Sequence, residues 1–198
     1  MKRRDFFKLG AKKTAKVVYE AASAGAELRA TKWFRPPFAV AEIDFLLDCT
    51  RCDKCIEACE HGVLFKLPAR YGAEAVGTPV LDLLNKGCLL CVDWPCVTVC
   101  EPGALKLPNL EDEEVARLPK LAVARINEDT CLPYSGPECG ACAASCPVPG
   151  ALTWADSVKP IIDQALCTGC ALCREACITE PKSIAITVPA PTVDGDFD

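Results

Sequence analysis

The chain has 198 residues, of which 25% are charged, and a formal net charge of −5. This composition is typical of a globular protein with one domain or two small ones. No run approaches the roughly eighteen consecutive apolar residues of a transmembrane helix. Basic residues are concentrated in the first 35 positions, and acidic residues predominate in the rest. An acidic body argues against nucleic acid as a partner, because phosphate binding requires clustered Lys and Arg.

Residues 1–38 are predicted to form a basic N-terminal helix. The start, Lys2-Arg3-Arg4-Asp5-Phe6-Phe7-Lys8, resembles the twin-arginine export motif, but charged residues interrupt the apolar stretch that an export signal needs. Apolar residues recur at three- and four-residue steps, which indicates an amphipathic helix; they are Phe6, Leu9, Val17, Ala21, Ala24 and Leu28.

That helix has three interpretations. It can pack on protein, lie on an anionic membrane surface, or act as an export signal. We expect a cytoplasmic location, with any association with a membrane surface made through this helix. Periplasmic location by twin-arginine export is the alternative.

Residues 39–188 contain all sixteen cysteines, in four groups of four. The first and last groups have the spacing C-x2-C-x2-C-x3-C of bacterial ferredoxins. Such compact runs argue against a disulfide scaffold and against structural zinc, whose C-x2-C pairs usually stand a dozen or more residues apart. Four thiolates per group predict four 4Fe–4S clusters with these iron ligands: Cys49, Cys52, Cys55, Cys59; Cys88, Cys91, Cys96, Cys100; Cys131, Cys139, Cys142, Cys146; and Cys167, Cys170, Cys173, Cys177.

The groups indicate an internal repeat. Each is followed by a short apolar stretch, and similar stretches precede groups three and four. We expect strands at 63–67, 104–107, 121–126, 151–154, 160–163 and 184–188, with a cysteine loop and a short helical turn in each repeat. The expected fold class is α+β: a polyferredoxin of two pseudo-symmetric two-cluster ferredoxin-like modules, preceded by the N-terminal amphipathic helix.

Two segments carry no candidate ligand. Residues 109–120, with the acidic run at 111–114, are predicted to be a solvated linker or the start of a helix, and a docking patch for a basic partner is the alternative. Residues 189–198 are predicted to be a disordered tail.

Motifs for other chemistry are missing from the sequence. It has no G-x-G arrangement for a nucleotide or flavin and no C-x-x-C-H for haem attachment, and its single histidine is His61. We therefore predict no catalytic residue, and expect an electron carrier with a redox protein or complex as its partner.

Four stretches resemble the ferredoxin-type proteins of periplasmic nitrate reductase and methylamine utilisation clusters (the NapG/MauM type). They are Arg35-Pro36-Pro37, Gly77-Thr78-Pro79, CLLCVDWPCVTVC at 88–100 and CITEPKSIAI at 177–186. The first and third groups also resemble the companion cytoplasmic ferredoxin of the nitrate reductase clusters. The resemblance implies a relay that passes electrons through four 4Fe–4S clusters to or from a redox enzyme or a quinol-oxidising membrane complex. An assembly ferredoxin that docks on a molybdopterin oxidoreductase, or a wiring subunit of such a complex, is the alternative.

The resemblance also suggests which groups share clusters. The second group looks like that of four-cluster subunits in molybdopterin oxidoreductases, where the first group pairs with the fourth and the second with the third. By this nested analogy Cys177 completes the cluster of the first group, Cys59 that of the fourth, Cys146 that of the second and Cys100 that of the third. Sequential pairing, first with second and third with fourth, stays open.

Overall fold

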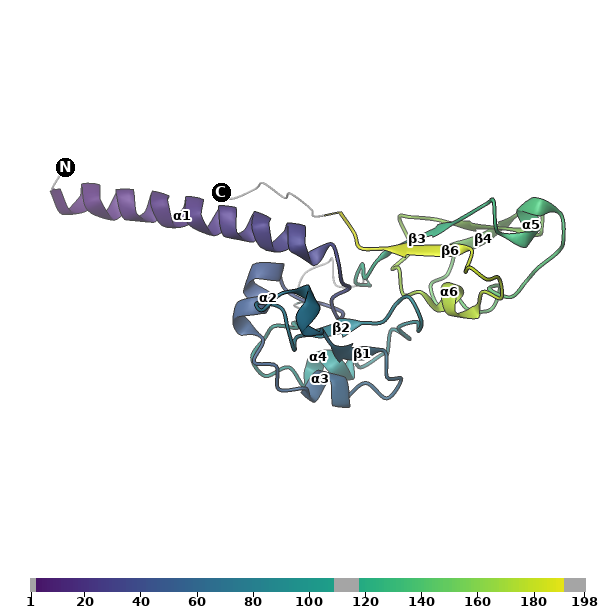
Figure 1. Cartoon of the computed structure of the whole chain (residues 1–198), viewed down its shortest axis with the longest axis horizontal. Helices are drawn as coiled ribbons and strands as arrows, with labels where there is room; N and C mark the ends of the chain where they lie inside the picture. The colour runs from purple at the N-terminus through teal and green to yellow at the C-terminus, as the bar shows by residue number, and fades with distance from the viewer. Residues whose placement is uncertain (1–2, 109–117, 191–198) are drawn as a thin grey trace.

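The computed structural model describes residues 3–108 and 118–190, with side chains from residue 16 onward. Figure 1 shows two modules side by side and a long helix, α1 (Arg3–Ala30), that runs along the first and extends beyond it. We call residues 31–108 the N-terminal module and residues 118–190 the C-terminal module. The predicted acidic run at 111–114 and nearly all of the predicted tail lie outside the described residues.

The N-terminal module contains one two-stranded sheet and several short helices. Strand β1 (Leu64–Lys66) pairs antiparallel with β2 (Pro79–Leu81), with Leu64 opposite Leu81. The helices are α2 (Glu42–Asp48), α3 (Lys54–Glu57) and α4 (Pro95–Thr98), with a 3-10 turn at Ala69–Tyr71. Helices α3 and α4 each begin next to the third cysteine of a group, so they fix where that thiol points.

The C-terminal module contains two two-stranded sheets. Strand β3 (Val123–Ile126) pairs antiparallel with β6 (Ile184–Thr187), and β4 (Leu152–Ala155) pairs with β5 (Lys159–Ile162). The short helices are α5 (Leu132–Ser135) and α6 (Leu172–Ala176). Pairing of the first and last strands closes the module and brings its two cysteine groups together.

The α+β class is confirmed, and most predicted strands are found. Strands β1, β3 and β6 lie within the expected stretches, and β4 and β5 overlap theirs but are each shifted by one residue. The strand expected at 104–107 is wrong, because Leu105 makes only an isolated bridge to Ala39. Strand β2 was not predicted. Its three buried residues lack the polar alternation that marks a half-exposed strand.

Buried apolar residues form three clusters. One, which we call the shared core, joins Leu64, Leu81 and Leu83 of the N-terminal module to Ala122 and Ile186 of the C-terminal module, among others. The other two are confined to α1 and the N-terminal module; one surrounds Trp33 and Val80, the other Phe45 and Val97. The interface between the modules is therefore continuous apolar packing.

Helix α1 docks on the N-terminal module through small and polar side chains. Ala26 and Ala30 are buried, the Tyr19 hydroxyl donates to Asp44 at 3.0 Å, and Glu27 accepts the Glu42 backbone N–H at 3.0 Å. Among the described residues, no helix is long and apolar enough to cross a membrane.

The apolar stripe predicted from the sequence faces away from this contact. Val17 and Leu28 are 63% and 68% exposed, and Ala21 and Ala24 are exposed too. The Phe6 and Leu9 side chains lie outside the described residues. The amphipathic helix is thus not confirmed as a packing element of the body.

Candidate metal centres

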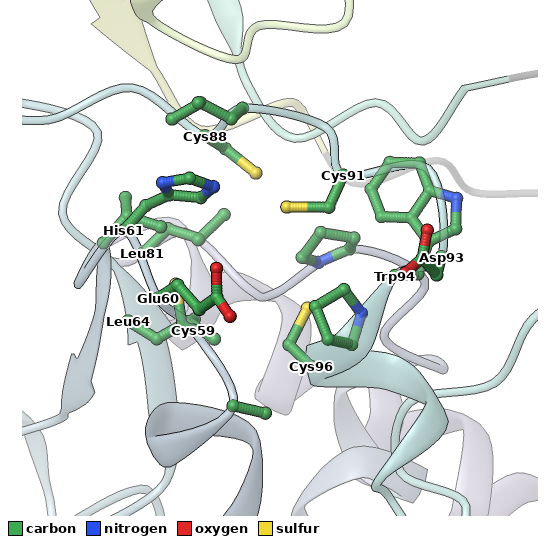
Figure 2. A pocket seen from close by; sticks show the side chains of 15 residues that line it. Cys59, Glu60, His61, Leu64, Leu81, Cys88, Cys91, Asp93, Trp94 and Cys96 are labelled. Carbon is green, nitrogen blue, oxygen red and sulfur yellow. The ribbon is translucent and has the colours of Figure 1, made fainter.

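The sixteen thiols gather in sets of four. Figure 2 shows Cys88, Cys91 and Cys96 turning their sulfurs toward one cavity of about 210 Å³, which Cys59 of the first group also lines. We call these four thiols site B. The cavity is also lined by Leu64, Leu81 and Trp94, so strands β1 and β2 each contribute one lining residue between the two cysteine loops.

Three further sets have the same composition. Site A, at a second cavity, comprises Cys49, Cys52, Cys55 and Cys100. Site C, at a third, comprises Cys146, Cys167, Cys170 and Cys173. Site D comprises Cys131, Cys139, Cys142 and Cys177, whose thiols lie close enough for the charge of Cys177 to raise the pKa of both Cys131 and Cys142.

This grouping contradicts the nested pairing. Cys100 lies with the first group and Cys59 with the second, while Cys177 lies with the third group and Cys146 with the fourth. Each module exchanges its fourth cysteines internally, as two-cluster ferredoxins do. The nested analogy fails because β3 pairs with β6 and β1 with β2, and these sheets close each module before the other is reached.

Three of the cysteine loops share a backbone pattern. The residue before the second cysteine, and the residue two before the third, adopt positive φ in groups one, two and four: Arg51, Asp53, Leu90, Trp94, Gly169 and Ala171. Left-handed conformations of non-glycine residues cost about 1–3 kcal/mol each and persist where the surroundings impose them.

The pattern turns backbone N–H groups toward sulfur. Gly169 donates to the Cys167 sulfur at 3.3 Å, Arg51 donates to Cys49 and Leu90 to Cys88. Successive N–H groups around left-handed residues form a concave anion site. These loops are therefore suited to thiolates, although group three, with seven residues between its first two cysteines, lacks the pattern.

The thiols carry strongly shifted pKa values. Burial, followed by the charges of neighbouring thiols, raises the pKa of Cys96 and of Cys173 to about 12. Burial is also the largest cause that raises the pKa of Cys55 and Cys88 to about 11. Four thiolates in such a site would repel one another, so the donor set fits a cationic group that compensates their charge.

The geometry fits a cluster better than a single ion. Among the side chains that the structure describes, in residues 16–108 and 118–190, no three of His, Cys, Asp or Glu converge as they do around one metal ion. The four thiols of sites A, B and C instead surround a cavity, as the four iron corners of a 4Fe–4S cube require.

Site D differs from the others in the environment of Cys177. Burial raises the pKa of this thiol, but the Thr179 hydroxyl, the N–H groups of Thr179 and Ser183, and Lys182 together lower it below its ordinary value. The Thr179 hydroxyl lies 3.2 Å from the sulfur. The sequence contained no pattern that marks these residues, although they lie within the 177–186 stretch quoted above.

The guanidinium of Arg35 lies next to site A, against Phe45. Arg35 forms a bidentate ion pair with Glu42, with N–O distances of 2.5 and 2.8 Å, and its guanidinium lies 4.3 Å from the centre of the Phe45 ring. Arg51 and Arg35 both lower the pKa of Cys49, although burial raises it more. Sequence reasoning quoted Arg35 only as part of a motif and assigned it no role.

His61 and Trp94 both line site B. The Trp94 ring also packs edge-on against Phe38, with ring centres 4.9 Å apart. Trp94 therefore serves both as a wall of the site and as ordinary core packing.

No family model and no solved structure matches the chain. Curated relatives do match. The methylamine utilization ferredoxin-type protein MauM of Methylobacillus flagellatus is 36% identical over 163 residues, which cover 77% of this chain and 67% of that protein. MauM of Methylophilus methylotrophus is 32% identical over 192 residues, which cover 93% and 83%. The ferredoxin-type protein NapG of Escherichia coli is 32% identical over 165 residues, which cover 77% and 69%.

Proposed function

The chain belongs to the family of ferredoxin-type proteins that includes MauM and NapG and is an iron–sulfur electron-transfer protein; we propose that it relays electrons through four 4Fe–4S clusters, one each at sites A, B, C and D. The observation that carries this proposal is the gathering of four thiols around each of three cavities, the fourth always supplied by the neighbouring group. Site D has the same donor set.

Each 4Fe–4S cluster, when bound, takes up and gives back one electron. The chain itself holds the cluster by four sulfurs, excludes water by burial and donates N–H groups to sulfur, and these are the means by which a protein sets the potential. We assign no catalytic residue, so the protein is an electron carrier and the chemistry occurs on its partner.

The partner is a redox protein or complex, and a quinol-oxidising membrane complex is one donor of this kind. The exposed stripe of Val17, Ala21, Ala24 and Leu28 supports contact of α1 with such a complex or with a membrane surface. We propose a cytoplasmic location, with twin-arginine export as the alternative.

Metal and sulfide analysis of protein purified without oxygen tests the proposal. We expect about sixteen irons and sixteen sulfides per chain. Replacing Cys91 with Ser, which removes one ligand of site B, should lower both values by about a quarter, whereas Ser145→Ala, which changes no ligand, should lower neither. Stoichiometric zinc in a colourless protein would contradict the proposal.

An assembly role is distinguished by partner binding. A relay binds its partner enzyme whether or not that enzyme contains its own cofactor. An assembly ferredoxin would bind only the cofactor-free enzyme, and its clusters would be lost readily in air.

A further inference from the structure

We infer that electrons pass between the two modules at one place, where the backbone N–H of Cys88 donates to the backbone carbonyl of Cys170, and that Gly87, Gly169 and Glu175 are positioning residues for this junction. The inference rests on the proposed function, because it assumes clusters at sites B and C. It adds the order of the sites and the residues that hold the modules together.

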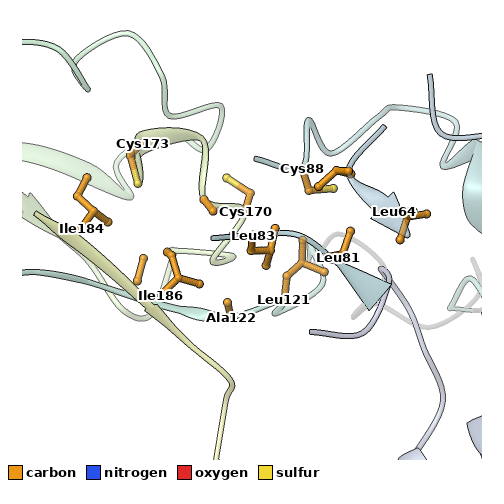
Figure 3. Packing of buried hydrophobic residues seen from close by; sticks show 13 residues of the cluster. Leu64, Leu81, Leu83, Cys88, Leu121, Ala122, Cys170, Cys173, Ile184 and Ile186 are labelled. Carbon is orange, nitrogen blue, oxygen red and sulfur yellow. The ribbon is translucent and has the colours of Figure 1, made fainter. Parts of the chain in front are cut away.

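The hydrogen bond at the junction joins a ligand of site B to a ligand of site C. Its N–O distance is 2.7 Å, and both cysteines are buried, with 7% of each residue exposed. Figure 3 shows both side chains among the buried residues of the shared core. The connection from sulfur to sulfur therefore runs through covalent bonds and one short hydrogen bond, with no solvent gap.

The cysteines that belong to the shared core also indicate the order of the four sites along the molecule. The thiols that it includes are those of Cys59, Cys88, Cys96, Cys167, Cys170 and Cys173, which belong to sites B and C, and of Cys142 from site D. No site A cysteine is among them. Sites B and C are therefore the inner pair, and sites A and D lie at opposite ends, which gives the order A–B–C–D.

Glycine is required where the modules approach most closely. A Cβ atom on Gly87 would lie 2.7 Å from the backbone N and Cα atoms of Leu172, which follows Cys170 by two residues. The Gly87 N–H donates to a Glu175 carboxylate oxygen at 2.8 Å. Gly87 and Glu175 therefore hold the loop of site B directly against α6.

Gly169, directly before Cys170, makes a close contact within the C-terminal module. It has φ +72°, and a Cβ atom there would lie 2.0 Å from the Ala122 carbonyl oxygen. The Leu121 N–H donates to the Thr168 carbonyl at 2.7 Å. The site C loop thus packs against the segment that precedes β3, which fixes the position of the Cys170 carbonyl.

Electron transfer at the junction needs no other reactant than a one-electron donor at one end of the chain and a one-electron acceptor at the other. An electron that crossed from a cluster held at site B to one held at site C would oxidise the first and reduce the second. No bond is made or broken and no proton moves.

Magnetic resonance of the intact protein with its clusters tests the inference. Two reduced clusters close together split or broaden each other's EPR signals. In the fully reduced wild type we expect this interaction between sites B and C. Gly87→Ala should remove or sharply reduce it while iron and sulfide stay at the wild-type value, because the added methyl group forces the loops apart.

Gly140→Ala is the matched control. Gly140 also lies in a cysteine loop, but a Cβ atom there would meet nothing within 4 Å. Its EPR spectrum should equal that of the wild type.

A second variant covers the case in which Gly87→Ala fails to bind clusters. Glu175 is exposed at the surface of α6, so Glu175→Ala should fold and retain all clusters, with a weakened interaction between sites B and C. The inference is overturned if Gly87→Ala keeps its full iron content and shows an unchanged interaction between sites B and C. If Gly87→Ala loses clusters, the same result in Glu175→Ala overturns it. Wild-type protein without iron and sulfide would instead overturn the proposed function.

Discussion

The N-terminal module has two apolar clusters besides its part of the shared core, one of them around the thiols of site A, whereas the buried apolar residues of the C-terminal module lie mainly in the shared core. Phe45 and Val97 are almost fully buried behind site A, but Ile184 and Ile186 belong to the cluster that crosses the interface. Similar cysteine loops are thus supported in two ways. The N-terminal module has a conventional core, and the C-terminal module depends on its clusters and on its neighbour.

The difference extends to the polar groups. In the N-terminal module Arg35 and Glu42 form an ion pair whose side chains are 12% and 3% exposed, and Arg35 also donates to Thr78 at 2.8 Å. In the C-terminal module a hydroxyl pair, Thr179 and Ser183, 2.7 Å apart, lies beside Cys177. A buried ion pair ties α2 to β2, while the hydroxyl pair serves only the end of one cysteine loop.

Removal of the clusters should give the largest difference between the two modules. We expect the C-terminal module to lose its protection from hydrogen exchange, a loss of about 5 kcal/mol or more, comparable with the full stability of a small domain. The amide of Val80 in β2 should stay protected, because this residue is almost fully buried in the cluster around Trp33, which includes no cysteine. Hydrogen exchange, measured by mass spectrometry before and after a chelator removes the iron, tests this expectation. An equal loss of protection in both modules would contradict it.

The ion pair gives the next largest effect. Arg35→Ala leaves the Glu42 carboxylate buried without its partner and should cost about 3–5 kcal/mol in the N-terminal module. Denaturant unfolding of the protein with its clusters measures this. Lys54→Ala, which removes the exposed pair of Lys54 with Glu101, is the control and should change stability little. A small effect of Arg35→Ala would show that the module does not depend on this pair.

The stability of cluster-free protein should fall at alkaline pH, and chiefly in the N-terminal module. Burial, with neighbouring thiols, raises the pKa of Cys55 and Cys88 to about 11 and that of Cys96 to about 12, above an ordinary value of 9.0. A pKa that is higher in the folded state adds stability below pH 9, and this contribution is lost as pH rises toward 11–12. Thermal unfolding of reduced, cluster-free protein at pH 8 and 10.5 should show the decrease.

Protein with its clusters is the control for that titration. Its ligands are already deprotonated, so its stability should depend less on pH over the same range. The same alkaline loss in both forms would mean that groups other than these thiols cause it.

Weakening the attachment of α1 should have the smallest effect. Glu27→Ala removes the acceptor of the Glu42 N–H and should loosen the end of α1 by about 1 kcal/mol. Faster hydrogen exchange at residues 19–30, with unchanged exchange in the C-terminal module, is the expected result. Glu20→Ala, which removes an exposed pair with Lys16 at 3.8 Å, should leave the same amides unchanged.

The sequence sets the local groups of cysteines, but it does not set which groups lie together in the fold. The spacing of Cys49, Cys52 and Cys55 is local, because one curled loop sets it. Whether Cys100 or Cys177 joins them depends on the path of the chain between groups. That path is set by the β1–β2 and β3–β6 pairings, and β2 had no recognisable period.

Two other features show the same limit. Periodicity correctly predicted a helix at the N-terminus. It took Val17 and Leu28 as part of the apolar face, but both are exposed, because the docked face consists of alanines and polar side chains. Arg35 belongs to no periodic pattern, and only the folded chain shows that Glu42, Phe45 and Thr78 surround it.

The most direct test of the central claim is a crystal structure of the anaerobic protein, with the irons located by their anomalous scattering. We expect a cube of four irons at each of the four sites, with the Cys100 sulfur bound to the cube of Cys49, Cys52 and Cys55, and the Cys177 sulfur bound to the cube of Cys131, Cys139 and Cys142. A map in which Cys177 completes the cube of the first group would contradict the account.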